Sequence, residues 1–263
     1  MNRSERRPPA GVVIAAAVTV AFFAIPLVGI IQRANWSAVR ADLTTPESLE
    51  ALRLSLVCSV SAAALSILFG TPLAWVLARV HIPGRPFIRG LVLLPMVLPP
   101  VVGGVALLAA FSLRSPIGGW LHDEFGIQLT FSTAGAIMAQ TFVAMPFFVI
   151  TVEGAMRSMD QRFEDAAACL GANRFTVFRR VTLPLIAPSV AAGAVLAWAR
   201  ALGEFGATIT FAGNIAGRTR TLPLAVYLEL ESDQEAAIAL SLVLVVVSLV
   251  VLVSLRDKWF IRA

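Results

Sequence analysis

The feature that most constrains this chain is a series of six long segments that contain no Asp, Glu, Lys or Arg. A helix needs about 20 apolar residues to cross a bilayer core of roughly 30 Å, because each residue rises about 1.5 Å and every backbone group must be hydrogen-bonded within the helix. The sequence therefore predicts an all-α membrane protein with six transmembrane helices, organised as a single domain over residues 1–263. We expect the spans at about 10–32, 53–78, 89–113, 131–153, 183–207 and 236–256.

The composition agrees with lipid as the main solvent of the chain. The sequence is 58% hydrophobic and 14% charged, whereas soluble domains are about a quarter charged. Cys58 lies in an apolar segment and Cys169 in a charged loop, so we expect two reduced thiols and no metal site. The first apolar segment is longer than a usual signal-peptide core and no small-x-small cleavage site follows it, which favours a membrane anchor over a cleaved signal.

The positions of the basic residues predict which way the spans cross the membrane. Of the 21 Lys and Arg residues, 14 lie before the first span, after the last span and in the 79–89 and 153–180 segments, while six lie on the other side and Arg200 lies within a span. Because cytoplasmic loops carry the excess of positive charge, we expect both termini in the cytoplasm and a multi-pass protein of the inner or plasma membrane. The net charge of +5 comes from these flanking clusters, so we expect membrane lipid and no nucleic acid as a partner.

The connection at 154–182, on the basic side, is too long to be only a loop. Apolar residues recur at spacings of three and four from Met159 to Leu170, which predicts an amphipathic helix with Asp160 as its N-cap. Gly171 is expected to end this helix, and Asn173 to cap a second, short one. Taken alone, the pattern also fits a helix that lies on lipid headgroups.

A spaced set of residues in this connection resembles the cytoplasmic signature of the membrane permeases of binding-protein-dependent ABC importers. That signature reads Glu-Ala-Ala, three residues, Gly, nine residues, Ile, one residue and Leu-Pro. Every interval is kept here, with Asp in place of Glu and Val in place of Ile, and the matching residues are Asp165, Ala166, Ala167, Gly171, Val181, Leu183 and Pro184. The resemblance implies the type I ABC importer permease architecture, in which this segment is a cytoplasmic coupling helix that docks on a separate ATPase subunit.

The segment 202–224 resembles the permeases of the molybdate branch of oxyanion importers, including tungstate carriers, and more distantly those for sulfate. The resemblance implies a pathway between two permease copies, closed by side chains of the third and fifth spans. It also implies two ABC ATPase subunits and an extracytoplasmic oxyanion-binding protein as partners. The chain has no GxxxxGK[ST] motif, so we expect no catalytic residue and no cofactor in it, with ATP hydrolysed by the partner subunit.

Two groups of residues are candidates for the pathway or its gate. Pro95, Pro99 and Pro100 should kink or break the third span near its middle, since proline removes a helix hydrogen bond. Arg200 and Glu204 are four residues apart, so they share a helix face and either line the pathway or form a structural ion pair.

Hydroxyl side chains further along the chain could line a path for an oxyanion, because a dianion in transit needs weak polar contacts and few fixed charges. Ordinary interfacial loop chemistry would explain the same residues. They are Thr208, Thr210, Thr219 and Thr221, with Arg218 and Arg220 expected at the outer mouth.

The sequence leaves three functions open. The first is an importer permease for molybdate or tungstate that works as a dimer, expected to be a homodimer. The second is a sulfate or thiosulfate ABC permease. The third is a proton-coupled secondary anion transporter with Arg200 and Glu204 as its relay, although the chain shows no internal repeat of the kind such transporters carry. A membrane-embedded enzyme or assembly scaffold is disfavoured because no catalytic cluster is present.

Overall fold

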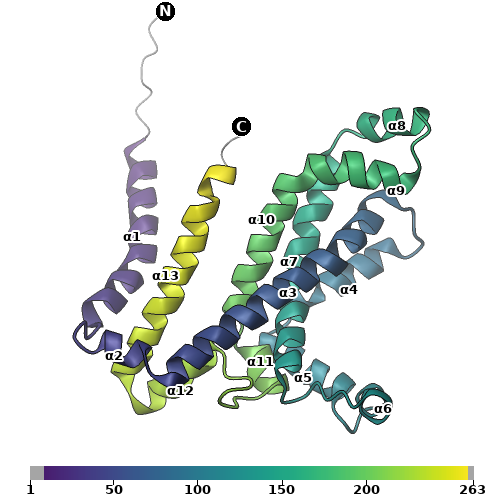
Figure 1. Ribbon diagram of the computed structural model, residues 1–263. Helices are drawn as coiled ribbons and strands as arrows, with labels where there is room; N and C mark the ends of the chain where they lie inside the picture. The colour runs from purple at the N-terminus through teal and green to yellow at the C-terminus, as the bar shows by residue number, and fades with distance from the viewer. Residues whose placement is uncertain (1–8, 260–263) are drawn as a thin grey trace, which may run out of the picture.

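A computed structural model describes residues 9–259, and every regular element in this part of the chain is helical (Figure 1). The long helices are α1 (Ala10–Arg33), α3 (Pro46–Arg79), α7 (Thr133–Ser158), α10 (Leu183–Leu202) and α13 (Gln234–Trp259). The shorter ones are α2 (Val39–Leu43), α4 (Arg85–Val97), α5 (Pro100–Phe111), α6 (Pro116–Phe125), α8 (Arg162–Cys169), α9 (Arg174–Val177), the π-helix η1 (Phe178–Thr182), α11 (Gly206–Phe211) and α12 (Leu222–Ser232). The predicted all-α fold class is confirmed.

Five helical segments of the described residues are long and apolar enough to cross a membrane by themselves. The pair α4 and α5 adds a sixth span only if the two are counted together, because they are bent by 119°. The span predicted over 89–113 thus corresponds to two helices, and the break predicted near its prolines is present. Leu98 adopts an extended conformation, as a residue before proline prefers, and Pro99 and Pro100 follow it.

The ends of other spans also differ from the predicted ones. The helix expected over 183–207 stops at Leu202, and a short non-helical segment separates it from α11. Helix α3 begins at Pro46, well before residue 53, because Thr45 caps it by accepting a hydrogen bond from the backbone N–H of Ser48. Helix α7 continues to Ser158, into the expected loop at 154–182.

Helix α7 lies at the centre of the packing and contacts α3, α10, α11 and α4. Its Phe148 is fully buried between α3 and α10, where two glycines make room for the ring. A Cβ atom built on Gly70 of α3 would lie 2.7 Å from Phe148 Cδ1, and one on Gly193 of α10 would lie 3.2 Å from Phe148 Cδ2. Small residues of this kind let membrane helices approach closely. The same core contains the alanines Ala62, Ala74, Ala144, Ala197 and Ala201.

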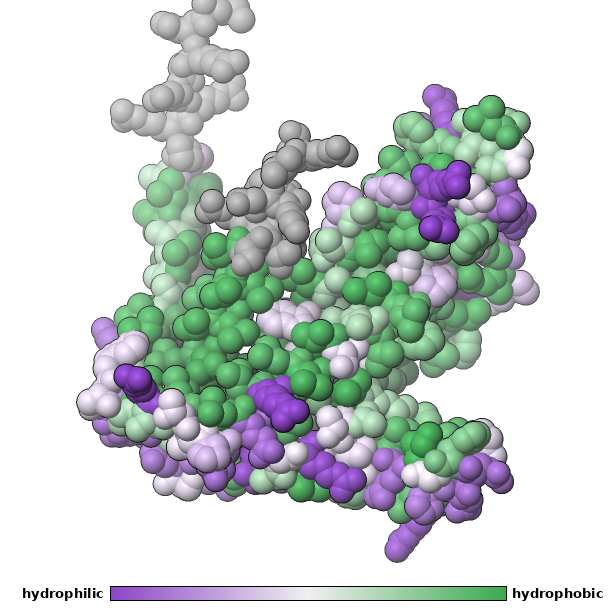
Figure 2. Space-filling model, viewed as in Figure 1, coloured by the Kyte–Doolittle hydropathy of each residue, from purple (hydrophilic) through white to green (hydrophobic). Residues whose placement is uncertain are grey.

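The elements divide between two ends of the molecule, as Figure 1 shows. The first turn of α1, the last turn of α13 and the short helices α8 and α9 lie at one end, and α2, α5, α6, α11 and α12 lie at the other. Figure 2 shows hydrophobic residues along the flank between these ends and hydrophilic residues gathered at the ends themselves. None of the residues of α1 is buried by the rest of the described chain.

The packing around Phe148 can be tested with glycine substitutions. We expect Gly70→Ala to destabilise the protein by about 1–3 kcal/mol, because the added methyl group would overlap the Phe148 ring. The measurement is the midpoint of thermal unfolding of the purified chain in detergent. Gly29→Ala in α1 is the matched control, since nothing lies within 4 Å of its Cβ position. Equal midpoints for the two variants would contradict the proposed packing.

Candidate functional site

The residues of the spaced signature lie at the end of the molecule that carries α8. Asp165 and Ala166 are exposed on α8, and Ala167 is half-buried. Gly171 ends the helix with a φ of 83°, in the left-handed region that favours glycine, and its Cβ position has nothing within 4 Å. Large apolar side chains on this surface are also exposed, namely Phe163, Leu170 and Phe175. An exposed helix with small and apolar residues is suited to contact with another protein.

The second helix expected in this connection is not a separate one. Asn173 caps α9 as predicted, its side-chain oxygen accepting a hydrogen bond from the N–H of Thr176 at 2.8 Å. From Arg174 onward, however, the chain runs without a break through η1 into α10, ending at Leu202. The π-helical turn at η1 precedes Pro184, which has no N–H to offer to the preceding turn. Asp160 accepts a hydrogen bond from Arg162 N, although the cap position itself is Gln161.

One carboxylate holds α8 against the spans. Glu164 accepts hydrogen bonds from Arg79 Nε at 2.8 Å and from Thr182 Oγ1 at 2.6 Å. Arg79 ends α3 and Thr182 belongs to η1, so the contact joins three elements. The side chains of Arg79 and Glu164 are only 10% and 15% exposed, which strengthens a charged hydrogen bond. This contact therefore ties α8 to the end of α3 and to the π-helical turn that precedes α10.

A second carboxylate at the same end was not recognised from the sequence. Glu153 near the end of α7 is 1% exposed and lies 2.7 Å from Arg157 Nη2 and 3.4 Å from Arg89 Nε of α4. A buried carboxylate needs such partners, since the cost of removing its charge from water is otherwise large. The only sequence signal was its place directly after an apolar segment, and that signal does not indicate which arginine would reach it.

The pair predicted in the fifth span is formed, at the end of the molecule away from α8. Arg200 Nη2 lies 2.6 Å from Glu204 Oε2, and the Glu204 side chain is 1% exposed. The other oxygen, Oε1, accepts a hydrogen bond from Ala207 N at 2.7 Å. Glu204 thus bridges the break between α10 and α11, because it pairs with the last turn of one helix and caps the first turn of the other.

The broken third and fifth spans pack against each other at this end. A Cβ atom on Gly104 of α5 would lie 2.7 Å from Thr210 Cβ and 2.9 Å from Ala207 O. A Cβ atom on Gly206 of α11 would lie 2.9 Å from Pro100 Cβ. The structure therefore brings two of the predicted gate residues, Pro100 and Thr210, to one contact. Pro99 is exposed beside it, whereas Pro95 is buried on α4 and faces a cavity next to α7.

The predicted hydroxyl residues are mostly enclosed in the single chain. Thr208, Thr219 and Thr221 have no exposed surface. Thr219 Oγ1 accepts a hydrogen bond from Ile215 N at 2.9 Å and donates one to Gly213 O at 3.2 Å, so it shapes the loop that contains it. Thr210 donates within its helix, to Gly206 O at 2.8 Å.

The two arginines expected at the outer mouth also contact this loop. Arg220 Nε donates a hydrogen bond to Asn214 Oδ1 at 3.0 Å. The backbone carbonyl of Arg218 accepts one from Thr133 Oγ1 at 2.7 Å, which ties the loop to the start of α7.

The fold is that of ABC importer permeases. The chain superposes with a TM-score of 0.74 on a chain from the crystal structure of a bacterial ABC transporter involved in the import of the acidic polysaccharide alginate, at 20% identity and covering 96% of this chain and 95% of that one. A chain of the inward-facing MetNI methionine ABC transporter gives a TM-score of 0.61 at 16% identity, covering 78% of this chain and 91% of that one.

Residues 67–263 match the family model described as the binding-protein-dependent transport system inner membrane component. Since the match covers about three quarters of the sequence, this chain belongs to that family and is a multi-pass membrane protein.

Several curated relatives resemble the chain over most of its length. The molybdenum transport system permease protein ModB of Mycobacterium tuberculosis is 50% identical over 84% of this chain and 83% of that protein. ModB of Escherichia coli K12 is 42% identical over 84% of this chain and 96% of that protein. The sulfate transport system permease protein CysT of the same strain is 35% identical over 74% of this chain and 70% of that protein.

The bridge formed by Glu204 generates a stability prediction. We expect Glu204→Ala to lower the free energy of unfolding by about 3–5 kcal/mol, because it leaves Arg200 without its counter-charge and the start of α11 without its cap. Glu204→Gln should cost less, since an amide oxygen can still accept from Ala207 N. Thermal unfolding in detergent measures both, with the exposed Glu231→Ala as control. An unfolding midpoint equal to that of the control would show that the bridge is not structural.

Proposed function

We propose that this chain is the membrane-spanning permease subunit of an ATP-driven importer for molybdate or tungstate. The choice of anion is supported by sequence identity: the chain is 50% and 42% identical to two molybdenum permeases and 35% identical to a sulfate permease, over comparable lengths. The residues predicted for the pathway are prolines, threonines and one Arg–Glu ion pair, so specificity for the anion would belong mainly to a separate binding protein.

In this proposal two copies of the chain form the conduit, two ABC ATPase subunits supply the work, and an extracytoplasmic oxyanion-binding protein delivers the anion. One structure of similar fold is described as a bacterial alginate ABC transporter in complex with an alginate pentasaccharide-bound periplasmic protein, which supports a separate binding protein as a partner. The chain has no phosphate-binding loop, and Lys258 is its single lysine. Nucleotide hydrolysis is therefore assigned to the partner subunit, with no cofactor bound here.

The force would enter at α8. An ATPase surface that engages Asp165, Ala166 and Ala167 would move Glu164 with them, since it lies on the same helix, and Glu164 would shift α3 and α10 through Arg79 and Thr182. At the other end of α10, Glu204 joins that helix to α11, which packs on α5. The contacts thus give a continuous route from the docking helix to the two broken spans.

The orientation follows from the same elements. The first turn of α1 and the last turn of α13 lie at the end of the molecule that carries α8, and that end has most of the basic residues. We therefore place both termini and α8 in the cytoplasm and the contact of α5 with α11 toward the outside.

A proton-coupled transporter is the less favoured alternative. A relay residue needs a position free to exchange a proton, whereas both oxygens of Glu204 already have partners, Arg200 on one and the N–H of Ala207 on the other. A sulfate or thiosulfate permease keeps the same fold and differs only in the cargo.

Docking through α8 can be tested with a charge substitution. We expect Ala166→Glu to lower ATPase stimulation and transport by about tenfold or more, because an unpaired charge buried in a docked interface costs more than about 1.4 kcal/mol. Membrane insertion should stay intact, since Ala166 is exposed. The control is Ala41→Glu, on the exposed surface of the short helix α2 at the opposite end of the molecule. Normal transport by Ala166→Glu would contradict the coupling role.

The cargo can be tested by uptake into liposomes that contain the chain with its ATPase and binding protein. We expect ATP-dependent uptake of molybdate, competition by tungstate at similar concentration and weak competition by sulfate. Stronger competition by sulfate than by tungstate would move the assignment to the sulfate branch. Uptake by the isolated chain under a pH gradient without ATP would instead support the proton-coupled alternative.

A further inference from the structure

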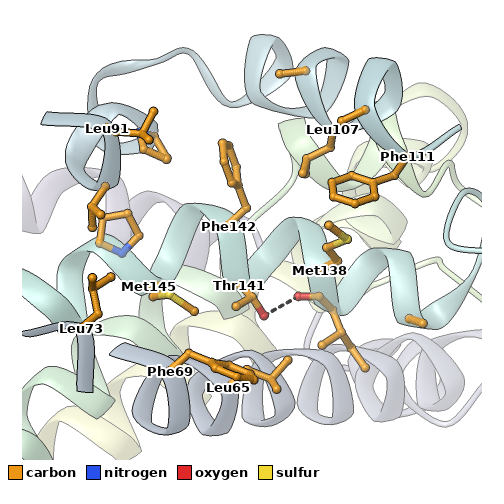
Figure 3. A pocket seen from close by; sticks show the side chains of 17 residues that line it. Leu65, Phe69, Leu73, Leu91, Leu107, Phe111, Met138, Thr141, Phe142 and Met145 are labelled. Carbon is orange, nitrogen blue, oxygen red and sulfur yellow. Dashed lines mark hydrogen bonds between the residues drawn. The ribbon is translucent and has the colours of Figure 1, made fainter. Parts of the chain in front are cut away.

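A large apolar cavity lies between α3, α4, α5 and α7 (Figure 3). It has a volume of about 780 Å³, and Thr141 is the only polar side chain among its 17 lining residues. The Thr141 hydroxyl donates to Ile137 O at 2.7 Å, so it is already satisfied within α7. The cavity therefore offers no polar group that an oxyanion needs. Figure 3 shows side chains of all four helices around it, among them Phe69, Leu91, Leu107, Met138 and Met145.

The cavity is elongated along the direction in which the spans cross the membrane. Its lining on α7 runs from Ala134 to Pro146, which is twelve residue steps and therefore about 18 Å of helix. Leu91 of α4 and Phe111 of α5 lie at opposite ends of the cavity (Figure 3), and α4 lies nearer to α8 than α5 does (Figure 1). An elongated space with an apolar lining at the depth of the bilayer matches the shape and the chemistry of a hydrocarbon chain. The flexible side chains of Met138 and Met145 suit an occupant without fixed geometry.

Two arginines lie on α4 just beyond the end of the cavity that Leu91 marks. Arg85 and Arg89 are four residues apart, and Val92, which lines the cavity, continues the same helix face. Arg85 is six residue steps, or about 9 Å, from Leu91. Arg89 shares Glu153 with Arg157 and keeps 40% of its side chain exposed. Among the side chains that the structure describes, none forms an ion pair with Arg85, and its Nε atom is buried without a hydrogen-bond partner.

We propose that this cavity is a binding site for an anionic phospholipid, with one acyl chain between α3, α4, α5 and α7 and the phosphate at Arg85 and Arg89. The acyl chain would fill the cavity and pack against its apolar lining. The phosphate would bind the two arginines, because guanidinium groups bind phosphate oxygens through paired hydrogen bonds. The net negative charge of the lipid matters, because a zwitterionic headgroup brings its own cation. The proposal rests on the orientation proposed above, which places Arg85 at the cytoplasmic leaflet, where anionic lipids meet basic residues.

The occupied site would act on the contact between the two broken spans. Leu107 and Phe111 line the cavity and also belong to the cluster that packs α5 on Ala207 and Phe211 of α11. An acyl chain in the cavity would contact the same Leu107 and Phe111 side chains that pack α5 toward α11. The lipid would thus stabilise the bent arrangement of α4 and α5 in which the structure is found.

The test measures lipid binding directly. The full-length chain is reconstituted in phosphatidylethanolamine vesicles with a minor share of phosphatidylglycerol that carries a photoreactive diazirine in its acyl chain. We expect the label on lining residues such as Met138, Phe142 and Met145. Arg85→Gln should lower the labelling about fivefold, the factor expected for one basic residue near an anionic lipid surface. Arg114→Gln, an exposed arginine at the opposite end, is the matched control.

A second pair of variants tests the cavity without changing charge. Ala110→Phe places a ring in the cavity and should abolish the labelling, whereas Ala109→Phe adds the same ring outside the lining. Three results would overturn the proposal. The first is equal labelling of the Arg85→Gln variant and the unchanged chain, and the second is equal labelling by phosphatidylethanolamine that carries the same diazirine. The third is label spread evenly over all spans. A disulfide formed between two copies carrying Ala110→Cys would also overturn it, because a second copy would then fill the space. Oxyanion uptake is not part of the readout, so a negative result leaves the proposed function standing.

Discussion

Polar groups at membrane depth have no water to satisfy them, and this constraint decides where the helices of this protein can break. Two spans are interrupted, one at Leu98–Pro99 and the other between Leu202 and Gly206. The Glu204 carboxylate bridges the second interruption, because it forms an ion pair with Arg200 and accepts a hydrogen bond from the N–H of Ala207. The two broken spans then cover each other, because α5 and α11 meet through glycines.

At the end of the molecule that carries α8, buried carboxylates connect separate helices, whereas Glu204 bridges a break within one span. Glu164 connects α8 to the end of α3 and to the π-helical turn before α10, and Glu153 connects α7 to α4. Each is largely buried and each has an arginine at hydrogen-bond or ion-pair distance. The contacts of Glu164 tie α8 to the helical body, as the proposed coupling role requires. The proposed function depends on these contacts more than on the exposed signature residues themselves.

Much of the architecture could be predicted from local sequence, since apolar length, prolines and caps act over a few residues. The break before Pro99 and the cap at Asn173 are examples that the structure confirms. The 119° bend could not be predicted, because its size depends on how Gly104 packs against α11, about a hundred residues later. The same limit applies to Glu164, whose partner Arg79 is distant in sequence. The prediction of a separate short helix after Asn173 was wrong, because η1 and α10 continue α9 without interruption.

The exposure of α1 has a consequence for how the protein adapts to its bilayer. None of its residues is buried by the rest of the described chain, and its main contacts there are with α13. A mismatch between helix length and hydrocarbon thickness can therefore be absorbed by a change in the tilt of α1. The central helices around Phe148 need not follow, so the protein can accommodate thinner or thicker bilayers at one edge while the geometry of its interior stays fixed.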